Sequence, residues 1–405
     1  MSRVPEASPP ALSGARRACL GLIFLGAAAL LWGCSGLPFG GGAPVAGPPQ
    51  EPTAVGTGHV KVALILPLSA AGNVGTAAAS MRNAGEMALA EFRNPDVQLL
   101  VKDDGASAFG AQQAAQQALD EGAEIILGPL FAQSVSAVGQ AARARGVPVI
   151  AFSTDSSVAG RGVYLLSFLP EADVERIISY SASVGKRAIA ALIPDNAYGS
   201  VVEGALKQTV ARRGARIVAL EHYQFDKLRL QDPARVIAQA SASADALFIP
   251  DGAEGVSAAV AALYSNGAKR IQLLGTGLWD DPRVFADINL QGGLYAAPNG
   301  AGFRAFATRY RAKFGQDPVR TATLAYDAVA LVAALVKTQG QQRFSEQVLT
   351  NPSGFAGLDG VFRFHADGTN DRGLAVLRVT QEGGQVVSPA PRAFAGSTVS
   401  DAHAQ

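Results

Sequence analysis

Residues 124–159 constrain the fold more than any other stretch of this chain, because they form a complete β-loop-α-β pattern. A short apolar run, 125–127, predicts the first strand. Ser134 is the predicted N-cap of a helix that closes at Gly146, and the apolar residues 147–150 predict the next strand. A helix between two short strands indicates a parallel pair with a right-handed crossover.

A loop follows each of these two strands, at residues 130–133 and 152–157. We predict that the loops lie side by side, because the carboxyl ends of parallel strands share one edge of a sheet. Ligands of open α/β sheets bind at that edge. Residues 153–157 (STDSS) are the densest run of small polar side chains in the chain. We interpret them as the centre of a binding cleft, and the alternative is a turn and helix-cap cluster without a ligand.

The N-terminus has the pattern of an export signal. Arg16 and Arg17 precede an apolar run, 18–32, which is short for a bilayer span. Cys34 follows the small residue Gly33, as in a bacterial lipobox, where the cysteine is lipidated and begins the mature protein. This predicts a lipoprotein signal peptide over 1–33. The alternatives are cleavage elsewhere and an uncleaved signal anchor.

Both ends of the predicted mature chain lack an apolar period. Residues 34–58 are rich in Gly and Pro, which predicts a tether between a lipid anchor and a folded body. Residues 385–405 are predicted to be a disordered tail. The 405 residues, 48% of them hydrophobic, leave enough chain for two globular lobes, and a net charge of +1 gives no electrostatic case for nucleic acid.

Two successive sets of alternating strands and helices, 60–168 and 172–274, each predict a parallel sheet covered on both faces. The last third adds two helices within 303–336 and an expected closing hairpin of 360–364 with 374–379. These elements form no third set. We therefore expect the chain to cross back to the first lobe and then to the second, so that several crossovers form a hinge.

This interpretation predicts where each lobe begins and ends. The N-terminal lobe is expected over 59–169 and 292–345. The C-terminal lobe is expected over 170–291 and 346–384.

Eight short strings, spread in order along residues 60–379, carry a family resemblance. They are Leu66-Pro67-Leu68-Ser69, 85–90 (GEMALA), Lys102-Asp103-Asp104, Leu127-Gly128-Pro129, 147–150 (VPVI), Tyr198-Gly199, Ala325-Tyr326-Asp327-Ala328 and 360–364 (GVFRF). In order and spacing they resemble the type I periplasmic binding-protein fold, in its leucine/isoleucine/valine-binding branch. The resemblance implies an α/β fold of two Rossmann-like lobes with parallel sheets, joined by a multi-crossover hinge and separated by a ligand cleft.

The resemblance also implies how a ligand carboxylate would be held. Amino-acid binders of the family use a serine in the loop after the third strand, and Ser134 is the approximate counterpart here. In the next loop they use a small residue and a threonine, whereas this chain has Ser153, Thr154 and Asp155. A carboxylate at Asp155 would repel a ligand carboxylate unless it is paired or protonated.

The opposite end of the implied pocket is altered as well. Tyr198 matches the aromatic residue of the second lobe, although it could also be a packing residue at a helix start. No acid stands near Thr276 to receive a ligand ammonium, and Trp279 could either stack on a ligand or cover the hinge. The residues that we expect to contact a ligand are Ser69, Gln133, Ser134, Ser153, Thr154, Asp155, Tyr198, Thr276 and Trp279.

Residues 151–155 (AFSTD) and 274–282 (LGTGLWDDP) are similar to those of a lipoprotein subgroup called penicillin-binding-protein activators. The first hypothesis is therefore a lipid-anchored, non-enzymatic activator that binds a peptidoglycan synthase. The alternative is an ABC-transporter solute-binding lipoprotein that hands an amino acid or other small polar ligand to a permease. Both place the chain in the periplasm on a membrane, and Ser35 after the cysteine favours the outer membrane over the inner.

The sequence offers no constellation for catalysis. The four histidines lack metal-ligand spacing, and P-loop, dinucleotide and nucleophile-elbow motifs are absent, so we expect no enzyme, metal or cofactor. Ser183 and Lys186 match S-x-x-K, which we interpret as coincidence because Gly185 breaks the helix between them. Asp103 and Asp104 are interpreted as a strand-end turn rather than a metal site.

Overall fold

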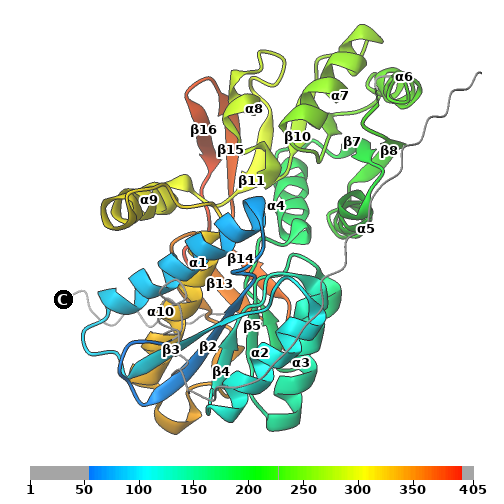
Figure 1. Ribbon diagram of the computed structural model, residues 1–405. Helices are drawn as coiled ribbons and strands as arrows, with labels where there is room; N and C mark the ends of the chain where they lie inside the picture. Colours follow the sequence, from blue (N-terminus) through cyan, green and yellow to red (C-terminus); the bar gives the residue numbers. More distant parts are fainter. Residues whose placement is uncertain (1–53, 227, 395–405) are drawn as a thin grey trace, which may run out of the picture. The chain divides into compact units, whose positions relative to one another are not determined.

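Two largely parallel β-sheets, each covered by helices on both faces, organise the part of the chain that the computed structural model describes, residues 54–226 and 228–394 (Figure 1). All of these residues belong to one compact unit, Glu51–Gln405. The α/β class with two lobes is confirmed. The predicted signal peptide and Cys34 lie outside the described residues. Within the described ranges, no helix is long and apolar enough to cross a membrane.

The first lobe contains a sheet of order β1-β3-β2-β4-β5-β6, in which only the β1–β3 pair is antiparallel. Its strands are apolar and almost wholly buried, as expected for a sheet with helices on both faces. The elements are β1 (Ala54–Val55), β2 (Val60–Leu66), α1 (Gly72–Glu91), β3 (Val97–Asp103), α2 (Ala108–Asp120), β4 (Ile125–Leu127), α3 (Ala132–Arg145), β5 (Val149–Ala151), η1 (Ser156–Val158) and β6 (Val163–Leu165).

The second lobe repeats this topology, because the parallel order β8-β7-β9-β10-β11 corresponds to β3-β2-β4-β5-β6. Two antiparallel strands, β15 and β16, extend it at the β11 edge. The elements are α4 (Pro170–Ser183), β7 (Ala188–Pro194), α5 (Ala197–Arg212), β8 (Arg216–Tyr223), α6 (Gln231–Ala240), β9 (Ala246–Phe248), α7 (Ala253–Ser265), β10 (Gln272–Gly275), η2 (Gly277–Trp279), α8 (Pro282–Ala286), β11 (Leu294–Ala297), β15 (Ala375–Thr380) and β16 (Gly383–Ser388).

The segment between β11 and β15 returns to the first lobe. Leu324 and Val329 of α10, with Phe362 and Phe364 of β13, lie in the same buried core as Leu64 of the first sheet. The returning elements are α9 (Gly300–Phe314), α10 (Ala322–Thr338), η3 (Gly340–Gln342), α11 (Glu346–Leu349), and the small antiparallel sheet β12 (Phe355–Gly357), β13 (Gly360–Phe364) and β14 (Asn370–Arg372).

The expected closing hairpin is wrong. β13 pairs with β12 and β14, whereas β15 pairs with β11 and β16, so the two predicted partners belong to different sheets. Alternating apolar residues identify both as strands. Tertiary contacts decide which strands pair with each other, and the alternating pattern does not specify the partner.

The structure also moves several lobe boundaries. β11, expected in the N-terminal lobe, pairs in parallel with β10 and belongs to the second sheet. Residues 346–372, expected in the C-terminal lobe, pack on the first. β1 lies within the predicted tether and β16 begins just before the predicted tail, and each forms hydrogen bonds along a sheet edge.

The β-loop-α-β unit forms as predicted, as β4, α3 and β5. Gly146 ends α3 in the left-handed conformation, with φ of 66°. The predicted N-cap is wrong: Phe131 precedes the first helical residue, and Ser134 lies buried in the first turn. Gly128 is required where β4 ends, because its φ is 88° and a Cβ there would lie 2.1 Å from the carbonyl oxygen of Ile65.

Candidate functional site

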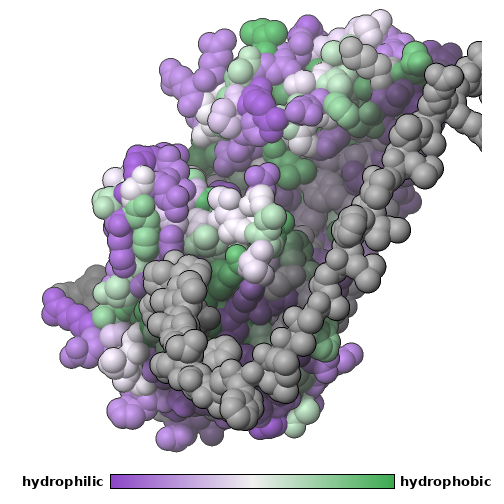
Figure 2. Space-filling model, in the orientation of Figure 1, coloured by the Kyte–Doolittle hydropathy of each residue, from purple (hydrophilic) through white to green (hydrophobic). Residues whose placement is uncertain are grey.

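A cavity of about 360 Å³ is lined by residues of both lobes and of the crossovers between them. This volume lies within the usual range for small-molecule sites. The view in Figure 2 shows hydrophobic residues where the upper and lower parts adjoin, between mostly hydrophilic outer surfaces. The apolar lining residues are Phe168, Pro170, Leu278, Ala297 and Pro298, and the residues with polar side chains are Thr154, Asp173, Tyr198, Asp280 and Arg320.

Tyr198 reaches the cavity from the start of α5. The Asn196 side chain caps this helix by accepting a hydrogen bond from the N–H of Gly199 at 2.8 Å. The Tyr198 hydroxyl is hydrogen-bonded to the Thr276 hydroxyl at 2.8 Å. Burial, with the nearby Asp173 carboxylate, raises the pKa of Tyr198, so the phenol stays neutral. Two predicted site residues therefore meet as one hydrogen-bonded pair, in which the buried Thr276 supports Tyr198.

Three charged residues that line the cavity, Asp173, Asp280 and Arg320, are not among the predicted ligand contacts. Asp173 lies in the first turn of α4, and its Oδ2 accepts a hydrogen bond from the N–H of Gly277 at 2.9 Å. Burial, with a smaller contribution from Glu171, raises the pKa of the Asp173 carboxyl to about 7. A carboxyl thus does stand beside Thr276, although it comes from another element. Acidic residues are common in the first turn of a helix, so the position of Asp173 in the sequence did not indicate a ligand contact.

Arg320 lines the cavity with a guanidinium group whose positive charge is already paired with a carboxylate. Its guanidinium donates to both carboxylate oxygens of the buried Asp359, at 2.9 and 2.7 Å. The guanidinium carbon also lies 4.8 Å from the ring centres of Phe168 and Phe303. Because Asp359 neutralises Arg320, the carboxyls of Asp173 and Asp280 make this wall net acidic.

Three residues predicted from the first lobe lie in one loop cluster outside the cavity lining of the described chain. The N–H of Ser69 donates to Asp103 Oδ1 at 3.2 Å, and Gln133 Nε2 donates to the carbonyl of Ala106 at 3.2 Å. Ser134 is fully buried and directs its hydroxyl at the carbonyl of Ser107 at 3.5 Å. These contacts hold neighbouring strand-end loops together.

In the 153–157 loop, only Thr154 lines the cavity among the described residues. Ser153 is buried and accepts a hydrogen bond from the N–H of Asp155 at 3.1 Å. Asp155 in turn caps η1, accepting from the N–H and the hydroxyl of Ser157 at 3.0 and 2.6 Å. The contacts of Ser153 and Asp155 are those of the alternative interpretation, a turn and cap cluster.

Trp279 cannot stack on a ligand, which corrects its place among the ligand contacts. It is fully buried in the core of the second lobe, and its Nε1 donates to the carbonyl of Ile249 at 3.2 Å. Gly275 makes room for it, since a Cβ at that position would lie 2.2 Å from the indole. Its exposed neighbour Leu278 faces the cavity instead.

The acids after β3 make turn contacts. Asp103 Oδ1 accepts from the N–H of Gly105 at 2.9 Å, and Asp104 Oδ1 accepts from the N–H of Ala106 at 2.8 Å. Over residues 54–226 and 228–394, no group of three or more His, Cys, Asp or Glu side chains is arranged to hold a metal ion.

A family model described as periplasmic binding protein matches residues 59–385. Comparison with curated protein sequences gives no match. Among solved structures, a Rhodospirillum rubrum protein described as a candidate branched-chain amino acid ABC transporter is similar with a TM-score of 0.73 and 18% identity, over 81% of this chain and 99% of that one.

Two further structures share the fold and contain ligands. An ABC transporter substrate-binding protein from Desulfitobacterium hafniense, in complex with Leu, has a TM-score of 0.61 and 18% identity, over 81% of this chain and 99% of that one. A solute-binding protein of an ABC transporter from R. palustris, in complex with benzoate, has a TM-score of 0.57 and 18% identity, over 83% and 98%. At this identity the likeness shows the fold alone.

Proposed function

Because the chain belongs to the periplasmic binding-protein family, we propose that it is a solute-binding protein of an ABC-type uptake system. The family places it in the periplasm as a binding protein rather than an enzyme. The proposal rests on the cavity between the lobes, whose lining combines aromatic and aliphatic side chains with a few convergent polar groups. The solute bound there would be delivered to a membrane permease.

The lining supports a ligand that joins an apolar body to a hydrogen-bond donor. Phe168 and Leu278 offer apolar contact within the cavity. Asp173 keeps one carboxyl oxygen beyond the bond to Gly277, and Asp280 accepts only the Tyr295 hydroxyl, at 3.0 Å, among the described residues. An ammonium group between the two acids would have both charge and hydrogen bonds satisfied. We therefore propose an amine-bearing solute with an apolar side chain.

The activator of peptidoglycan synthases is the weaker hypothesis. One of the two strings that favour it contains Trp279, and the burial of Trp279 accounts for that residue by core packing. The lipid anchor at Cys34 and the outer-membrane location stay predictions, because they concern residues outside the described ranges. Both features fit a solute receptor and a synthase activator equally.

A matched ligand series tests the proposal with the purified full-length chain. Leucine, isoamylamine, which lacks the carboxylate, and isocaproate, which lacks the amine, are compared with benzoate in thermal-shift and calorimetric titrations. We expect leucine and isoamylamine to bind and isocaproate and benzoate to bind weakly or not at all. Leu278→Ala is expected to weaken binding, and Glu382→Gln, an exposed control, to leave it unchanged.

The same preparation is used to capture membrane proteins and is titrated with muropeptides. Capture of a peptidoglycan synthase, combined with no stabilisation by any small solute, would reverse the order of the two functions. Binding of benzoate and isocaproate, but of neither amine, would keep the solute-binding function and refute the amine specificity.

A further inference from the structure

The guanidinium of Arg320 keeps two hydrogen-bond donors without a partner among the described residues. An arginine side chain has five N–H donors. Three of them are engaged here: Nη1 donates to Asp359 Oδ2 at 2.9 Å and to Thr323 Oγ1 at 3.2 Å, and Nη2 donates to Asp359 Oδ1 at 2.7 Å. The donors that remain are the Nε–H and the second N–H of Nη2.

These two donors form one edge of the planar group. Asp359 occupies the edge made by Nη1 and Nη2, and Thr323 accepts from the other N–H of Nη1. The Nε–H and the second N–H of Nη2 are adjacent and parallel, which is the fork that binds both oxygens of a carboxylate. Arg320 can therefore bind a second carboxylate while its contact with Asp359 stays intact.

The fork is accessible. The Arg320 side chain is 35% exposed and lines the cavity between the lobes. Its Nε is not one of the fully buried polar atoms that lack a partner in the described chain. A ligand in the cavity can therefore reach it.

The surroundings of Arg320 hold the guanidinium in place. Asp359 is buried, so its two hydrogen bonds to Arg320 are shielded from water. The guanidinium carbon also packs 4.8 Å from the ring centres of Phe168 and Phe303. Because the group is oriented before a ligand arrives, less conformational entropy is lost on binding.

The loop that the family resemblance implies for a ligand carboxylate is arranged differently in this chain. Ser134 and Ser153 are buried, and the carboxylate of Asp155 caps η1. Among these loop residues only Thr154 lines the cavity, and it is the neighbour of Asp155 in the chain. The charge of Asp155 would repel a ligand carboxylate bound at this loop.

The charged groups of the cavity come from different lobes. Asp173 of α4 and Asp280, which follows η2, belong to the second lobe, whereas Arg320 precedes α10, which packs on the first. A solute that carries both an ammonium and a carboxylate can place the ammonium between the two acids and the carboxylate on Arg320. A carboxylate without an ammonium would leave both acids unpaired and add a third negative charge.

We propose that Arg320 is a specificity-determining residue, which binds a carboxylate of the solute through the fork of Nε and Nη2. The solute is then a zwitterion that connects the two lobes, with its ammonium on Asp173 and Asp280. This role of Arg320 rests on the proposed function, because it concerns the same cavity.

Three amines with one apolar skeleton test the role on the full-length chain. Leucine carries a carboxylate, leucinamide carries a neutral carboxamide in its place, and isoamylamine carries neither. We expect calorimetric titration to show leucine binding about tenfold more tightly than the other two, because a charged fork is stronger than a neutral contact. Arg320→Lys keeps a positive charge for Asp359 but loses the fork, and should remove most of this preference. A purely structural role would change the affinity for all three amines equally.

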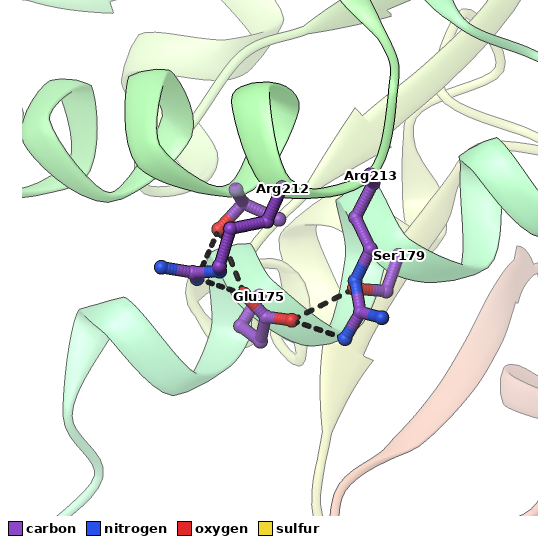
Figure 3. A network of polar contacts seen from close by, with 5 residues as sticks. Glu175, Ser179, Arg212 and Arg213 are labelled. Carbon is purple, nitrogen blue, oxygen red and sulfur yellow. Dashed lines mark hydrogen bonds and ion pairs between the residues drawn. The ribbon is translucent and has the colours of Figure 1, made fainter.

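Arg213→Lys is the matched control. Arg213 also pairs with a carboxylate, that of Glu175 at 2.6 Å, but it does so at the end of α5 and outside the cavity lining of the described chain (Figure 3). We expect this variant to keep the preference for leucine. If Arg320→Lys does not fold, as judged by its thermal transition, a crystal structure of the parent chain with leucine replaces it. The leucine carboxylate should then lie within hydrogen-bond distance of Nε and Nη2 of Arg320.

Three outcomes would overturn the role of Arg320 and leave the proposed function standing. They are equal affinity for the three amines, a preference for leucine that Arg320→Lys leaves intact, and a leucine carboxylate bound at Thr154 in the crystal. Absence of binding by all three amines at millimolar concentration would refute the proposed function together with this role.

Discussion

At the scale of single residues, Asp173 shows how position decides chemistry. Its place in the first turn of α4 is ordinary for an acid, yet the fold sets it beside Gly277 at the edge of the cavity. Burial raises the pKa of its carboxyl to about 7, so near neutral pH the group exchanges between a hydrogen-bond donor and a charged acceptor. That exchange gives the site a pH dependence.

We expect the affinity for an amine-bearing solute to rise between about pH 6 and about pH 8, because the ionised carboxylate of Asp173 pairs with the ammonium. Asp173→Asn should remove this dependence and weaken binding at the higher pH about tenfold. Calorimetric titration of both proteins across that range measures the effect. A dependence of equal size in the variant would assign it to another group.

The contribution of Asp173 to the stability of the protein should fall as the pH rises, whereas its contribution to solute affinity should increase. A carboxyl whose folded pKa is raised stabilises the fold in its neutral form, so this contribution is complete below the ordinary value of 3.8 and is lost as the pH rises through about 7. Asparagine imitates the neutral form. Asp173→Asn should therefore unfold at no lower temperature than the parent at about pH 8.

Trp279 and its neighbour Leu278 provide a second test at this scale. Trp279→Ala should lower the free energy of unfolding by about 3–5 kcal/mol, because it empties a fully buried site in the second core. Leu278→Ala removes a side chain that is 45% exposed and should change stability little. Urea unfolding measures both, and a stable Trp279→Ala that has lost solute binding would return Trp279 to the site.

At the scale of elements, α4 connects several parts of the molecule. Its first turn contributes to the cavity, and its middle is joined to α5 through Glu175. Burial by itself would raise the pKa of Glu175, but hydrogen bonds from Arg213, Arg212, Thr209 and Ser179 outweigh burial and lower it to about 2. The network thus stabilises the ionised carboxylate and, with it, the contact between two helices.

Because the pKa of Glu175 is lower in the folded protein than in the unfolded chain, its carboxylate stabilises the fold at pH values above the unfolded pKa of 4.5. This contribution is lost as the pH falls towards the folded pKa of about 2. Glu175→Gln should therefore cost about 1 kcal/mol at neutral pH, a modest amount because the carboxylate is one-third exposed, and less at about pH 3. Urea unfolding at the two pH values measures the difference. Asp232→Asn, whose carboxylate is 85% exposed, is the matched control and should show neither effect.

At the scale of the whole molecule, neither lobe is continuous in sequence. The first sheet is completed by a cover that the chain supplies more than 130 residues after β6, from α10 and β13. The edge strands of the second sheet, β15 and β16, follow that cover in the sequence. Each lobe therefore depends on residues that follow a part of the other lobe in the sequence.

A chain that ends at Asn299 should fail to form a cooperative first lobe, because the apolar face of its sheet loses Leu324, Phe362 and Phe364. Calorimetry is expected to show no sharp transition, with increased binding of an apolar dye. A chain that ends at residue 394 is the control and should unfold as the full-length protein does. A sharp transition in the shorter chain would mean that the returning segment is dispensable.

Much of the fold could be predicted because its signals are local. Apolar runs bounded by Gly and Pro identified the strands, and Gly146 ended its helix as expected. The partners of the strands were harder to predict from the sequence. β13 and β15 were expected to form one hairpin, and β11 was expected in the other lobe. A strand's own residues contain its period but not its partner.

The candidate site was predicted in part. Thr154 and Tyr198 line the cavity, and Thr276 supports Tyr198 from behind. Ser153 and Asp155 belong to a turn, and Trp279 belongs to a core. Asp173, Asp280 and Arg320 were missed: Asp173 has an ordinary position in the first turn of a helix, and Arg320 lies in the turn before α10, far along the chain from the Asp359 that it contacts.

By itself, the sequence determined the alternation of strands and helices and the family to which the chain belongs, since periodicity, turn residues and short ordered strings act over a few neighbouring positions. Only the tertiary structure decided which strands pair, which polar side chains stay accessible, and which acid faces the cavity. Those properties depend on burial and on distances between residues a hundred or more positions apart, such as Asp173 and Gly277.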